Sequence, residues 1–575
     1  MNTTTKENLN LWLSANIDME TKNELTRLIK EHPEKIEEGF YSRLSFGTGG
    51  LRGVMGLGTN RMNIYTVGLA TQGLANYIKQ TNSKKRVFIG YDSRNNSRLF
   101  AERAALVLAG NGIEAILTKE LRPTPIVSFG CRYYKCGAAI MITASHNPPE
   151  YNGYKVYWKD GGQVVPPHDK GIIKEVNAIT SLDQVRAEES IVHPMIRRVL
   201  EEVDDAYLEA IQKQQLTPRF NQENGRKLHI VYSNLHGTGI TLMPRAMETW
   251  GFPRLTTVEQ QNEPDGNFPT TTYPNPEDAK ALQLGLKKLE AVEGDILIAT
   301  DPDADRVGLA VRHQGNTYIL TGNQVACLLL DHICRRTEKL PDNAAFVKTI
   351  GTTELFKEIA EAHGAACVDV LTGFKYIAEK IEKWEEDPQG LKFLFGGEES
   401  YGYLLGTHAH DKDAIISSTL IAEAALHAKC NGQTLIDQLN RIWKQHGIHL
   451  EKLSTLVFPE TREGHEEMEK GMRKIEQEPP ASLAGIPVTS VENYLTSIKT
   501  DLRTGQQEPL ELPKSSVLRL WLEDGSKVMV RPSGTEPKVK FYCGVKLEKF
   551  DSIEEGTARM EAHANSLLSS MRDLF

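Results

Sequence analysis

The sequence predicts an α/β protein made of three successive mixed α/β domains and a smaller C-terminal α+β domain. Up to Pro459, short apolar runs typical of buried strands alternate with segments of helical periodicity, which is the pattern of α/β domains. After Pro459, further prolines interrupt the chain, and apolar residues recur at strand spacing in 517–522, 527–530 and 540–546. That second pattern is typical of an antiparallel sheet in a small separate domain.

Length, charge and cysteine usage predict a multidomain protein of the cytoplasm. A chain of 575 residues has room for roughly four domains. The net charge of −9 at pH 7 argues against a nucleic-acid partner and a polybasic membrane surface, although it allows a local positive pocket. Seven scattered cysteines without a CxxC pair predict neither disulfides nor a zinc site. A polar N-terminus and the lack of a long apolar run predict no signal peptide and no membrane span.

The elements of each domain follow from the same patterns, taken in chain order. In the first domain we expect helices at 65–79 and 99–109, strands at 86–90 and 138–142, and a charged helical junction at 197–214. In the second we expect a strand at 229–232, a helix at 242–250 and a strand at 295–300. In the third we expect strands at 346–348 and 392–395 and helices at 353–363, 417–429 and 435–445. The predicted domains are 1–204, 205–321, 322–455 and 456–575.

The polar turn at 143–149 carries a candidate nucleophile, Ser145. The apolar run at 138–142 leads straight into this turn, and Pro148 and Pro149 stop the chain there. Ser145 therefore falls at the C-terminal end of a predicted strand, where open α/β sheets bind their ligands. From these residues alone, a surface serine in a capped turn is an equally simple interpretation.

A cluster of carboxylates follows the predicted strand at 295–300: Asp301, Asp303 and Asp305. Like charges this close repel one another unless a cation lies among them, and an all-oxygen set favours Mg²⁺ over zinc. An EF-hand calcium loop is excluded, because Arg306 and Arg312 stand where that loop needs Gly and Glu. The alternative is a solvated acidic turn.

A serine beside Mg²⁺ suits phosphoryl transfer, because the metal neutralises charge on the phosphoryl oxygens. The sequence has no G-x-S-x-G elbow, which weakens an esterase interpretation. It has no Walker A sequence either, so ATP is not an obvious phosphate donor.

Two further loops can bind parts of a sugar phosphate. The predicted strand at 392–395 leads into a glycine-rich loop, in which Glu398 and Ser400 offer an acceptor and a hydroxyl for sugar OH groups. The predicted strand at 527–530 leads into a second loop with one guanidinium, two hydroxyls and backbone N–H groups for a phosphate. Its residues are Arg531, Ser533, Gly534 and Thr535. A plain turn remains the alternative for this loop.

Other candidates carry weaker signals. Arg52, in the glycine-rich run 47–53, can bind phosphate bidentately, although a flexible glycine turn explains the run as well. Lys155 can have a depressed pKa among cations and aromatic surface and move a proton, or be an exposed lysine on a hairpin. His236 is as readily structural as functional. Lys412 can reach an anion or pair with the aspartates beside it.

The four loops occur in one order from Gly47 to Lys538, and on them the chain resembles the α-D-phosphohexomutases, the phosphoglucomutase/phosphomannomutase superfamily. It looks most like the longer type that includes bacterial phosphoglucomutases and animal phosphopentomutase relatives. The resemblance implies four domains around a central cleft, with a smaller and mobile fourth domain. A mutase needs two distinct anion-binding loops, as found here, and a simple phosphatase does not.

The resemblance also implies roles for the candidate residues. Ser145 becomes a phosphoserine whose phosphate, with the three aspartates, holds Mg²⁺. Arg52 and Lys155 match positions of phosphate handling and acid/base work, and His146, the neighbour of Ser145, joins them as a catalytic candidate. Some phosphomannomutase-like and phosphoglucosamine members carry His where this chain has Gly402, so the second acid/base group stays open. The substrate-binding candidates are Arg306, Glu398, Ser400, Lys412, Arg531, Ser533, Gly534 and Thr535.

The implied activity is interconversion of α-D-glucose 1-phosphate and glucose 6-phosphate, with Mg²⁺ as cofactor and glucose 1,6-bisphosphate as intermediate and activator. The partners are then small sugar phosphates, without nucleic acid or membrane, and the protein is a monomer or homodimer. Phosphopentomutase, phosphomannomutase and glucose 1,6-bisphosphate synthase activities stay open as alternatives. A serine phosphatase would release inorganic phosphate faster than isomer. A silent sugar-phosphate sensor would have lost Ser145 or the aspartates, which this chain keeps.

Overall fold

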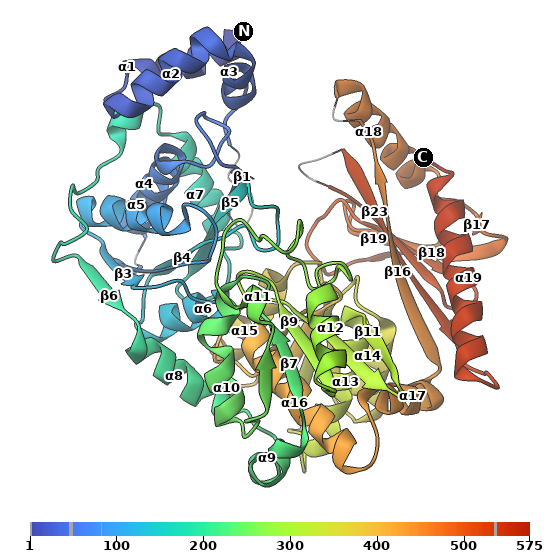
Figure 1. Ribbon diagram of the computed structural model, residues 1–575. Coiled ribbons are helices and arrows are strands. Elements are labelled where there is room, and N and C mark those ends of the chain that lie inside the picture. The colour runs from blue at the N-terminus through green and yellow to red at the C-terminus, as the bar shows by residue number, and fades with distance from the viewer. Residues whose placement is uncertain (1–2, 45–49, 82, 460, 534–536) are drawn as a thin grey trace. The chain divides into compact units, whose positions relative to one another are not determined.

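The chain divides into two compact units in the computed structural model shown in Figure 1. The first unit comprises residues 1–322 and 374–432, and the second comprises residues 323–373 and 433–575. The structure describes residues 3–44, 50–81, 83–459, 461–533 and 537–575.

A six-stranded mixed sheet in the order β1-β5-β4-β2-β3-β6 forms the first part of the first unit. Its strands are β1 (Gly50–Val54), β2 (Arg86–Tyr91), β3 (Glu114–Thr118), β4 (Ala138–Ile142), β5 (Tyr151–Trp158) and β6 (Ile196–Val199). The strands β4, β2, β3 and β6 are parallel, whereas β5 runs antiparallel to both β4 and β1. The accompanying helices are α4 (Ile64–Gln80), α5 (Ser97–Gly110), α6 (Thr124–Tyr133), α7 (His168–Asn177), η1 (Leu182–Gln184) and α8 (Glu201–Gln212).

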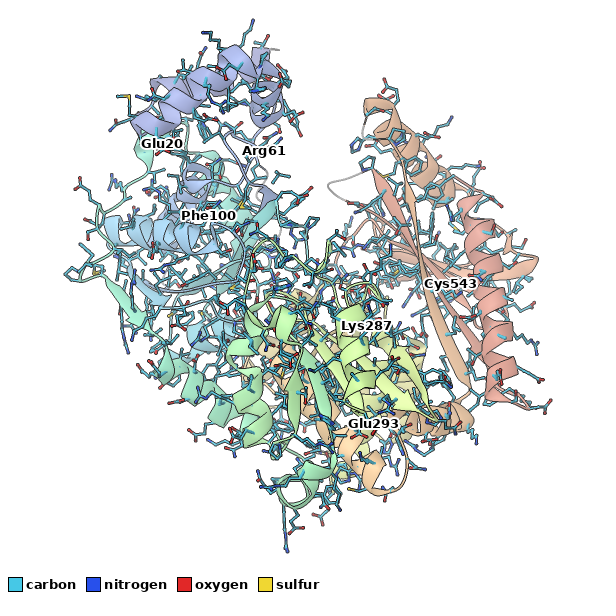
Figure 2. All side chains as sticks on the ribbon, in the orientation of Figure 1. Glu20, Arg61, Phe100, Lys287, Glu293 and Cys543 are labelled. Carbon is cyan, nitrogen blue, oxygen red and sulfur yellow. The ribbon has the colours of Figure 1, made fainter. Side chains whose placement is uncertain are left out.

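The core of this sheet forms where its apolar side chains meet those of α4 and α5. Phe100 of α5, labelled in Figure 2, lies in this core. All five residues of β4 are buried, which confirms the predicted strand at 138–142 and brings its C-terminal end to the turn with Ser145.

The charged helical junction predicted at 197–214 is wrong at its start. Arg197 and Arg198 lie in β6, and the helix α8 begins only at Glu201. Ile196 and Val199 are buried while the two arginines are exposed, so a short strand buries both apolar residues at the sheet edge.

Three helices that the sequence patterns did not reveal form the N-terminus: α1 (Thr3–Ser14), α2 (Met19–Glu31) and α3 (Pro33–Phe40). The side chain of Asp18 accepts a hydrogen bond from the Thr21 amide and so caps α2, and Pro33 opens α3 at a position that lacks a helical partner for its nitrogen. Trp12 and Phe40 pack edge to face with ring centroids 5.3 Å apart. This small apolar cluster holds the three helices together.

A five-stranded sheet in the order β11-β10-β9-β7-β8 forms the next part of the first unit. Its strands are β7 (Ile230–Ser233), β8 (Leu255–Thr257), β9 (Ile296–Thr300), β10 (Val307–His313) and β11 (Asn316–Leu320). Its helices are α9 (Pro218–Asn224), η2 (Gly225–Lys227), η3 (Thr238–Thr241), α10 (Met243–Thr249), α11 (Glu259–Asn262) and α12 (Gln283–Ala291). The same unit also contains α15 (Phe374–Glu386), the antiparallel pair β14 (Lys392–Glu398) and β15 (Gly402–Leu405), and α16 (Ala414–Cys430).

The second unit combines a parallel strand pair with a large antiparallel sheet. The pair is β12 (Ala344–Thr349) and β13 (Ala366–Val370), with α13 (Gly322–Arg336), α14 (Glu354–Ala362) and α17 (Leu435–His446). The sheet has eight strands: β16 (Ile448–Val457), β17 (Ser482–Leu483), β18 (Ile486–Asn493), β19 (Ile498–Asp501), β20 (Gln507–Pro509), β21 (Leu518–Leu522), β22 (Lys527–Pro532) and β23 (Lys538–Leu547). Its helices are α18 (Arg462–Gln477) and α19 (Ile553–Arg572), and α19 lies along the sheet beside β16 and β23 (Figure 1).

The antiparallel sheet confirms the change of pattern predicted after Pro459, because all its strand pairs run antiparallel. All seven cysteines, among them Cys543 of this sheet (Figure 2), are free thiols in the structure. No helix in the described part of the chain is long and apolar enough to cross a membrane.

Candidate active site

Ser145 lies in a strained turn directly after β4. Its φ of 53° is in the left-handed region, which residues other than glycine adopt rarely because it is strained. Its backbone N–H donates to Thr143 Oγ1 at 2.8 Å. The side chain is buried, so the turn presents a hydroxyl to the interior of the first unit and not to the surface.

Arg94 holds this turn in place from the loop after β2. Its fully buried guanidinium donates to the Ser145 carbonyl oxygen at 2.6 Å, to the Pro148 carbonyl at 2.8 Å, and also to the Asn147 carbonyl. Asp92 lies 3.4 Å from the guanidinium and balances its charge. A planar cation with several donors is suited to gathering carbonyl oxygens that converge on one point.

The Ser145 hydroxyl contacts an acid and an imidazole. Its Oγ lies 2.9 Å from Asp301 Oδ2 and 3.1 Å from His146 Nδ1. Burial lowers the pKa of His146 well below its usual value, and nearby arginines lower it further, so the ring is neutral at pH 7. The predicted pairing of a serine with the aspartate loop is therefore present in the structure.

The three aspartates form one buried cluster, here called the aspartate cluster: Asp301, Asp303 and Asp305. One oxygen from each lies within 4.8 Å of the others. The loop turns sharply at Ala304, whose φ is 49°, so that side chains two positions apart converge. Asp301 Oδ1 accepts the backbone N–H groups of Asp305 and Arg306 at 3.1 and 3.0 Å.

Other segments of the first unit fix this loop through its backbone. The Thr124 amide donates to the Asp303 carbonyl at 2.8 Å, and the Ala414 amide donates to the Ala304 carbonyl at 3.2 Å. Gly237 approaches so closely that a Cβ there would lie 2.4 Å from the Pro302 Cα. The position of the aspartates is thus set by residues far apart in the sequence.

Two lysines meet at one oxygen of the aspartate cluster. Lys155 Nζ lies 2.8 Å from Asp303 Oδ2 and 3.3 Å from Asp305 Oδ2. Lys412 Nζ lies 3.2 Å from the same Asp305 Oδ2 and 2.9 Å from Asp411 Oδ1. Both predicted lysines therefore reach the site, and Lys412 pairs with aspartates from its own segment and from the cluster.

The depressed pKa predicted for Lys155 is wrong. Burial alone would lower the pKa of this ammonium, but the charges of Asp303 and Asp305 outweigh burial and raise it. The sequence placed a lysine among cations and aromatic surface, whereas the fold places it against two carboxylates. The simpler alternative, an exposed hairpin lysine, is also wrong, because the side chain is 13% exposed in a strand flanked by two others.

Ser400 lies in the turn between β14 and β15, beside the aspartate loop, and Glu398 directly precedes this turn. Glu398 is the last residue of β14 and is buried, so it belongs to the strand and not to the predicted loop. Tyr401 takes a left-handed φ of 65° at the turn, and its carbonyl accepts the Val307 amide at 3.0 Å. That bond ties this turn to the strand that follows the aspartates.

Gly402 leaves room for Lys412. A Cβ at residue 402 would lie 2.2 Å from Lys412 Cδ, so a larger side chain there and Lys412 in this position exclude one another. Burial lowers the pKa of the Lys412 ammonium, but Asp305 and Asp411 raise it by more, and the ammonium stays charged.

Two arginines complete the charged side chains of this region. Arg306 Nη1 donates to Glu277 Oε1 at 2.8 Å, an acid that the sequence analysis did not single out. Arg52 of β1 is exposed and donates from Nη1 to Asn147 Oδ1 at 3.2 Å, beside Ser145. The preceding part of its glycine-rich run, 45–49, lies outside the described residues.

The remaining candidates lie elsewhere. His236 is buried with both ring nitrogens in hydrogen-bond contact, one with Glu263 and one with Thr270, which favours its structural interpretation. Arg531 lies in β22 of the second unit, and Ser533 follows it with its amide donating to the Lys538 carbonyl at 2.8 Å. Gly534 and Thr535 lie outside the described residues.

The aspartate cluster has the properties of a site for a hard cation. Asp303 Oδ1 and Asp305 Oδ1 are buried and accept no hydrogen bond. Burial raises the pKa of Asp301, and the charges of Asp303 and Asp305 raise it further, so ionising all three acids requires additional positive charge. Oxygen ligands without histidine or cysteine fit Mg²⁺ and similar ions.

Fold and site together define a multidomain α/β protein with a buried serine beside a carboxylate metal-binding cluster. The sequence matches three successive parts of one family, each described as Phosphoglucomutase/phosphomannomutase, alpha/beta/alpha domain: domain I over residues 43–183, domain II over 205–315 and domain III over 321–446. The chain belongs to the phosphoglucomutase/phosphomannomutase family. The predicted superfamily, the fold class and the enzyme class of phosphohexomutase isomerases are thereby confirmed.

Relatives at higher identity cover nearly the whole chain. A phosphoglucomutase of Staphylococcus epidermidis is 35% identical over 529 residues, which are 91% of this chain and 94% of the relative. One of Staphylococcus aureus is 35% identical over 555 residues, 95% of this chain and 97% of the relative.

Solved structures share the fold at lower identity. The open form of pp63/parafusin, a phosphoglucomutase from Paramecium, has a TM-score of 0.67 at 18% identity and covers 93% of this chain and 95% of its own. A phosphoglucomutase/phosphomannomutase family protein from Burkholderia thailandensis has a TM-score of 0.65 at 18% identity, covering 92% of this chain and 98% of its own.

Sequence reasoning missed several residues that shape the site: Arg94, Thr124, Tyr157 and Glu277. The pairing of Lys412 with an aspartate beside it, Asp411, is present as one of the two predicted alternatives. Asp92 and Arg94 follow β2 as the aspartates follow β9, so the rule that polar residues after buried strands face the site would have found Arg94. No local signal marks Glu277, which pairs with an arginine 29 residues away.

Proposed function

We propose that this chain is a phosphoglucomutase that interconverts α-D-glucose 1-phosphate and glucose 6-phosphate and carries the exchanged phosphoryl group on Ser145. The observation that carries the proposal is the contact of Ser145 Oγ with Asp301 Oδ2, 2.9 Å apart inside a buried group of three aspartates. A serine hydroxyl that serves only to cap a turn has no need of a carboxylate metal site. The preference for glucose rests on the names of the staphylococcal relatives.

The exchange takes two transfers. In the first, the bond between phosphorus and Ser145 Oγ breaks while the free hydroxyl of the sugar monophosphate bonds to phosphorus and loses its proton. Ser145 Oγ takes up a proton as it leaves, which gives glucose 1,6-bisphosphate and the unmodified serine. In the second, Ser145 Oγ loses its proton and takes the other phosphoryl group, whose sugar oxygen is protonated as it leaves. Phosphoserine is regenerated and the isomeric monophosphate is released.

The residues that would hold Mg²⁺ are Asp301, Asp303 and Asp305, together with the phosphate on Ser145. Asp303 Oδ1 and Asp305 Oδ1, which are buried and accept no hydrogen bond, fit such an ion. Bound there, the ion would neutralise charge on the phosphoryl oxygens, which is the main requirement in phosphoryl transfer.

The cations around the cluster have separate tasks. Lys155, on the strand beside the serine turn, is the first candidate for proton transfer at the reacting oxygen, and Arg52, at Asn147, is placed to hold the phosphate. Lys412 is the second proton-transfer candidate, because it fills the space at Gly402 where other branches are expected to carry His. His146 contacts Ser145 Oγ and serves to orient it.

The sugar and its second phosphate have candidate sites of their own. Glu398 and Ser400 are proposed to bind sugar hydroxyls, and Arg306 to bind a phosphate or sugar oxygen near the aspartates. In the second unit, the loop that begins at Arg531 and Ser533 is proposed to hold the phosphate that is not being transferred, with Gly534 and Thr535 as its further members. We propose that each of the four predicted domains supplies one part of the active site: the phosphoserine, the metal-binding aspartates, the sugar-binding residues and the second phosphate-binding loop.

The test is a substrate panel with the purified protein and Mg²⁺. We expect glucose 1-phosphate to be isomerised faster than mannose 1-phosphate or ribose 1-phosphate, with added glucose 1,6-bisphosphate raising the rate. Release of inorganic phosphate faster than isomer would identify a phosphatase and contradict the proposal. A higher kcat/KM on the mannose or ribose phosphate would move the function to another member of the same class.

A further inference from the structure

The strand β5 is connected to both lysines at the aspartate cluster, because it carries Lys155 and its Tyr157 bonds to Asp411, a partner of Lys412. Lys155 and Tyr157 are two residues apart in β5 and therefore point to the same face of the sheet. Tyr154, Val156 and Trp158 point to the opposite face and belong to the core with α4 and α5. Lys155 contacts the aspartate cluster directly. Tyr157 does not, and its hydroxyl bonds instead to Asp411, the residue before Lys412.

Asp411 links Tyr157 to Lys412. The Tyr157 hydroxyl donates to Asp411 Oδ2 at 2.9 Å, and Gln163 Nε2 donates to the same oxygen at 3.2 Å. The other oxygen, Oδ1, accepts both the backbone N–H and the Nζ of Lys412, at 2.8 and 2.9 Å. Tyr157 and Asp411 are buried, so solvent does not replace these bonds.

The backbone around Asp411 is held without Tyr157. The His410 amide donates to Ser128 Oγ at 2.8 Å. Asp413 caps α16 through the Ile415 amide at 2.9 Å and accepts the Tyr207 hydroxyl at 2.8 Å. Anchors on both sides leave the Tyr157 hydroxyl one evident task, which is to fix the orientation of the Asp411 carboxylate.

We propose that Tyr157 and Asp411 are positioning residues that aim Lys412 Nζ at Asp305, so that β5 sets the spacing between the two lysines. The geometry points to this because the two ammonium groups share Asp305 Oδ2, at 3.3 Å from Lys155 and 3.2 Å from Lys412. The catalytic part of the inference rests on the proposed function, whereas the placement of Lys412 does not.

The kinetic test removes one hydroxyl. Tyr157→Phe is expected to lower kcat for glucose 1-phosphate about tenfold and to leave KM within about twofold, as is usual when a supporting partner is lost. Asp411→Asn should lower kcat by at least as much. The matched control is Tyr154→Phe on the same strand, which loses a buried hydrogen bond to Thr71 on the opposite face and should keep wild-type kcat.

A double-mutant comparison separates positioning from general stabilisation. If Tyr157 acts through Lys412, Tyr157→Phe should cause no further loss in a Lys412→Met background. A loss as large in that background as in the wild type would overturn the proposal. An equal loss in Tyr154→Phe would overturn it as well.

A second measurement works without any turnover. Trinitrobenzenesulfonate labelling of Lys412, followed by peptide mass spectrometry, should be several times faster in Tyr157→Phe than in wild type and unchanged in Tyr154→Phe. Unchanged labelling in Tyr157→Phe would overturn the positioning role, even for a protein that isomerises none of the sugar phosphates. Faster labelling in a protein without mutase activity would support the placement of Lys412 and refute only the proposed function.

Discussion

The aspartate cluster of the first unit and a second group of buried and partly buried charges in the second unit differ in how well their charges are balanced. The second group, here called the Lys348 cluster, consists of Lys348, Glu354, Asp369, Glu492, Arg519 and Lys527. Lys348 Nζ lies 3.1 Å from both Glu354 and Asp369, and Lys527 Nζ lies 2.7 Å from Glu354. Arg519 closes the group at 2.6 Å from Glu492.

Three acids face three cations in the Lys348 cluster. Burial would raise the pKa of Glu354, but Lys527 and Lys348 lower it far below its usual value. In the aspartate cluster, Asp301 is fully buried and its pKa is raised, because burial and the charges of Asp303 and Asp305 outweigh the opposing effect of Arg306.

The lysines of the aspartate cluster cannot satisfy it alone. Lys412 is shared with Asp411, and Asp303 Oδ1 and Asp305 Oδ1 accept no hydrogen bond. Arg306 Nε lies 3.9 Å from Asp305 Oδ1, whereas the comparable oxygen of the Lys348 cluster, Asp369 Oδ1, has the Lys348 ammonium at 3.1 Å. Buried charge by itself therefore does not mark a ligand site. A local shortage of positive charge among buried carboxylates does, and it points to a cation that the fold does not supply.

The largest expected effect comes from Ser145→Ala. Removing the hydroxyl that carries the phosphoryl group should lower kcat for glucose 1-phosphate at least about 10⁴-fold, as for other catalytic nucleophiles. Thermal unfolding should change little, because the change removes one oxygen. Ser233→Ala is the control, since Ser233 is also buried at the end of a strand but bonds to Gln261. Retention of full activity by Ser145→Ala would contradict the assignment.

The next largest effect is expected on metal affinity, which should fall when the aspartate cluster is changed and stay the same when the Lys348 cluster is changed. Asp303→Asn should weaken Mg²⁺ or Mn²⁺ binding at least about 100-fold in calorimetry, because even residues that only support a metal ligand change affinity 10–100-fold. Glu354→Gln, in the Lys348 cluster, should leave the affinity unchanged. Equal weakening in both variants would show that the comparison between the clusters is wrong.

A smaller effect is expected on stability. Here the substitution is made in the Lys348 cluster, which we expect to stabilise the fold and not to bind a metal. Glu354→Gln leaves Lys348 and Lys527 short of a partner and should destabilise the protein by about 2 kcal/mol at pH 7, less than a fully buried pair because Glu354 is 25% exposed. Since folding lowers the pKa of Glu354, its stabilisation is present above the usual carboxyl pKa and is lost as pH falls.

The pH dependence provides the measurement for that prediction. The difference in Tm between wild type and Glu354→Gln should be largest near pH 7 and should shrink as the pH is lowered below 4. The exposed acid Glu24, paired with Arg27 on a helix surface, serves as control, and Glu24→Gln should leave Tm unchanged. A difference that grows toward acid pH would rule out the ionic role of Glu354.

The sequence alone predicted the strands that lead into the serine turn, the aspartate loop, the Glu398 loop and the Arg531 loop, but it missed many of the other strands. The strand at 138–142 and the aspartates after 295–300 are local patterns, because an apolar run ending in polar residues needs no knowledge of the rest of the fold. The four domain boundaries stay predictions, since compactness divides the chain into two units instead.

What the sequence did not predict depends on residues that meet only after folding. Arg94 reaches carbonyls more than 50 positions later, and the charge state of Lys155 depends on carboxylates about 150 positions later. The strained backbone at Ser145 has no signature either, because a serine gives no sign of a left-handed φ. The strand β6 was not predicted because two of its four residues, Arg197 and Arg198, are charged and exposed at the sheet edge, so its sequence lacks the apolar pattern of a strand.

The most direct measurement is the mass of the intact protein after incubation with glucose 1,6-bisphosphate, followed by peptide mapping. We expect one added phosphate on the wild-type protein, located on Ser145. The Ser145→Ala variant, treated in the same way, should acquire none. A protein that isomerises glucose phosphates at full rate while Ser145 is never esterified would contradict the central claim.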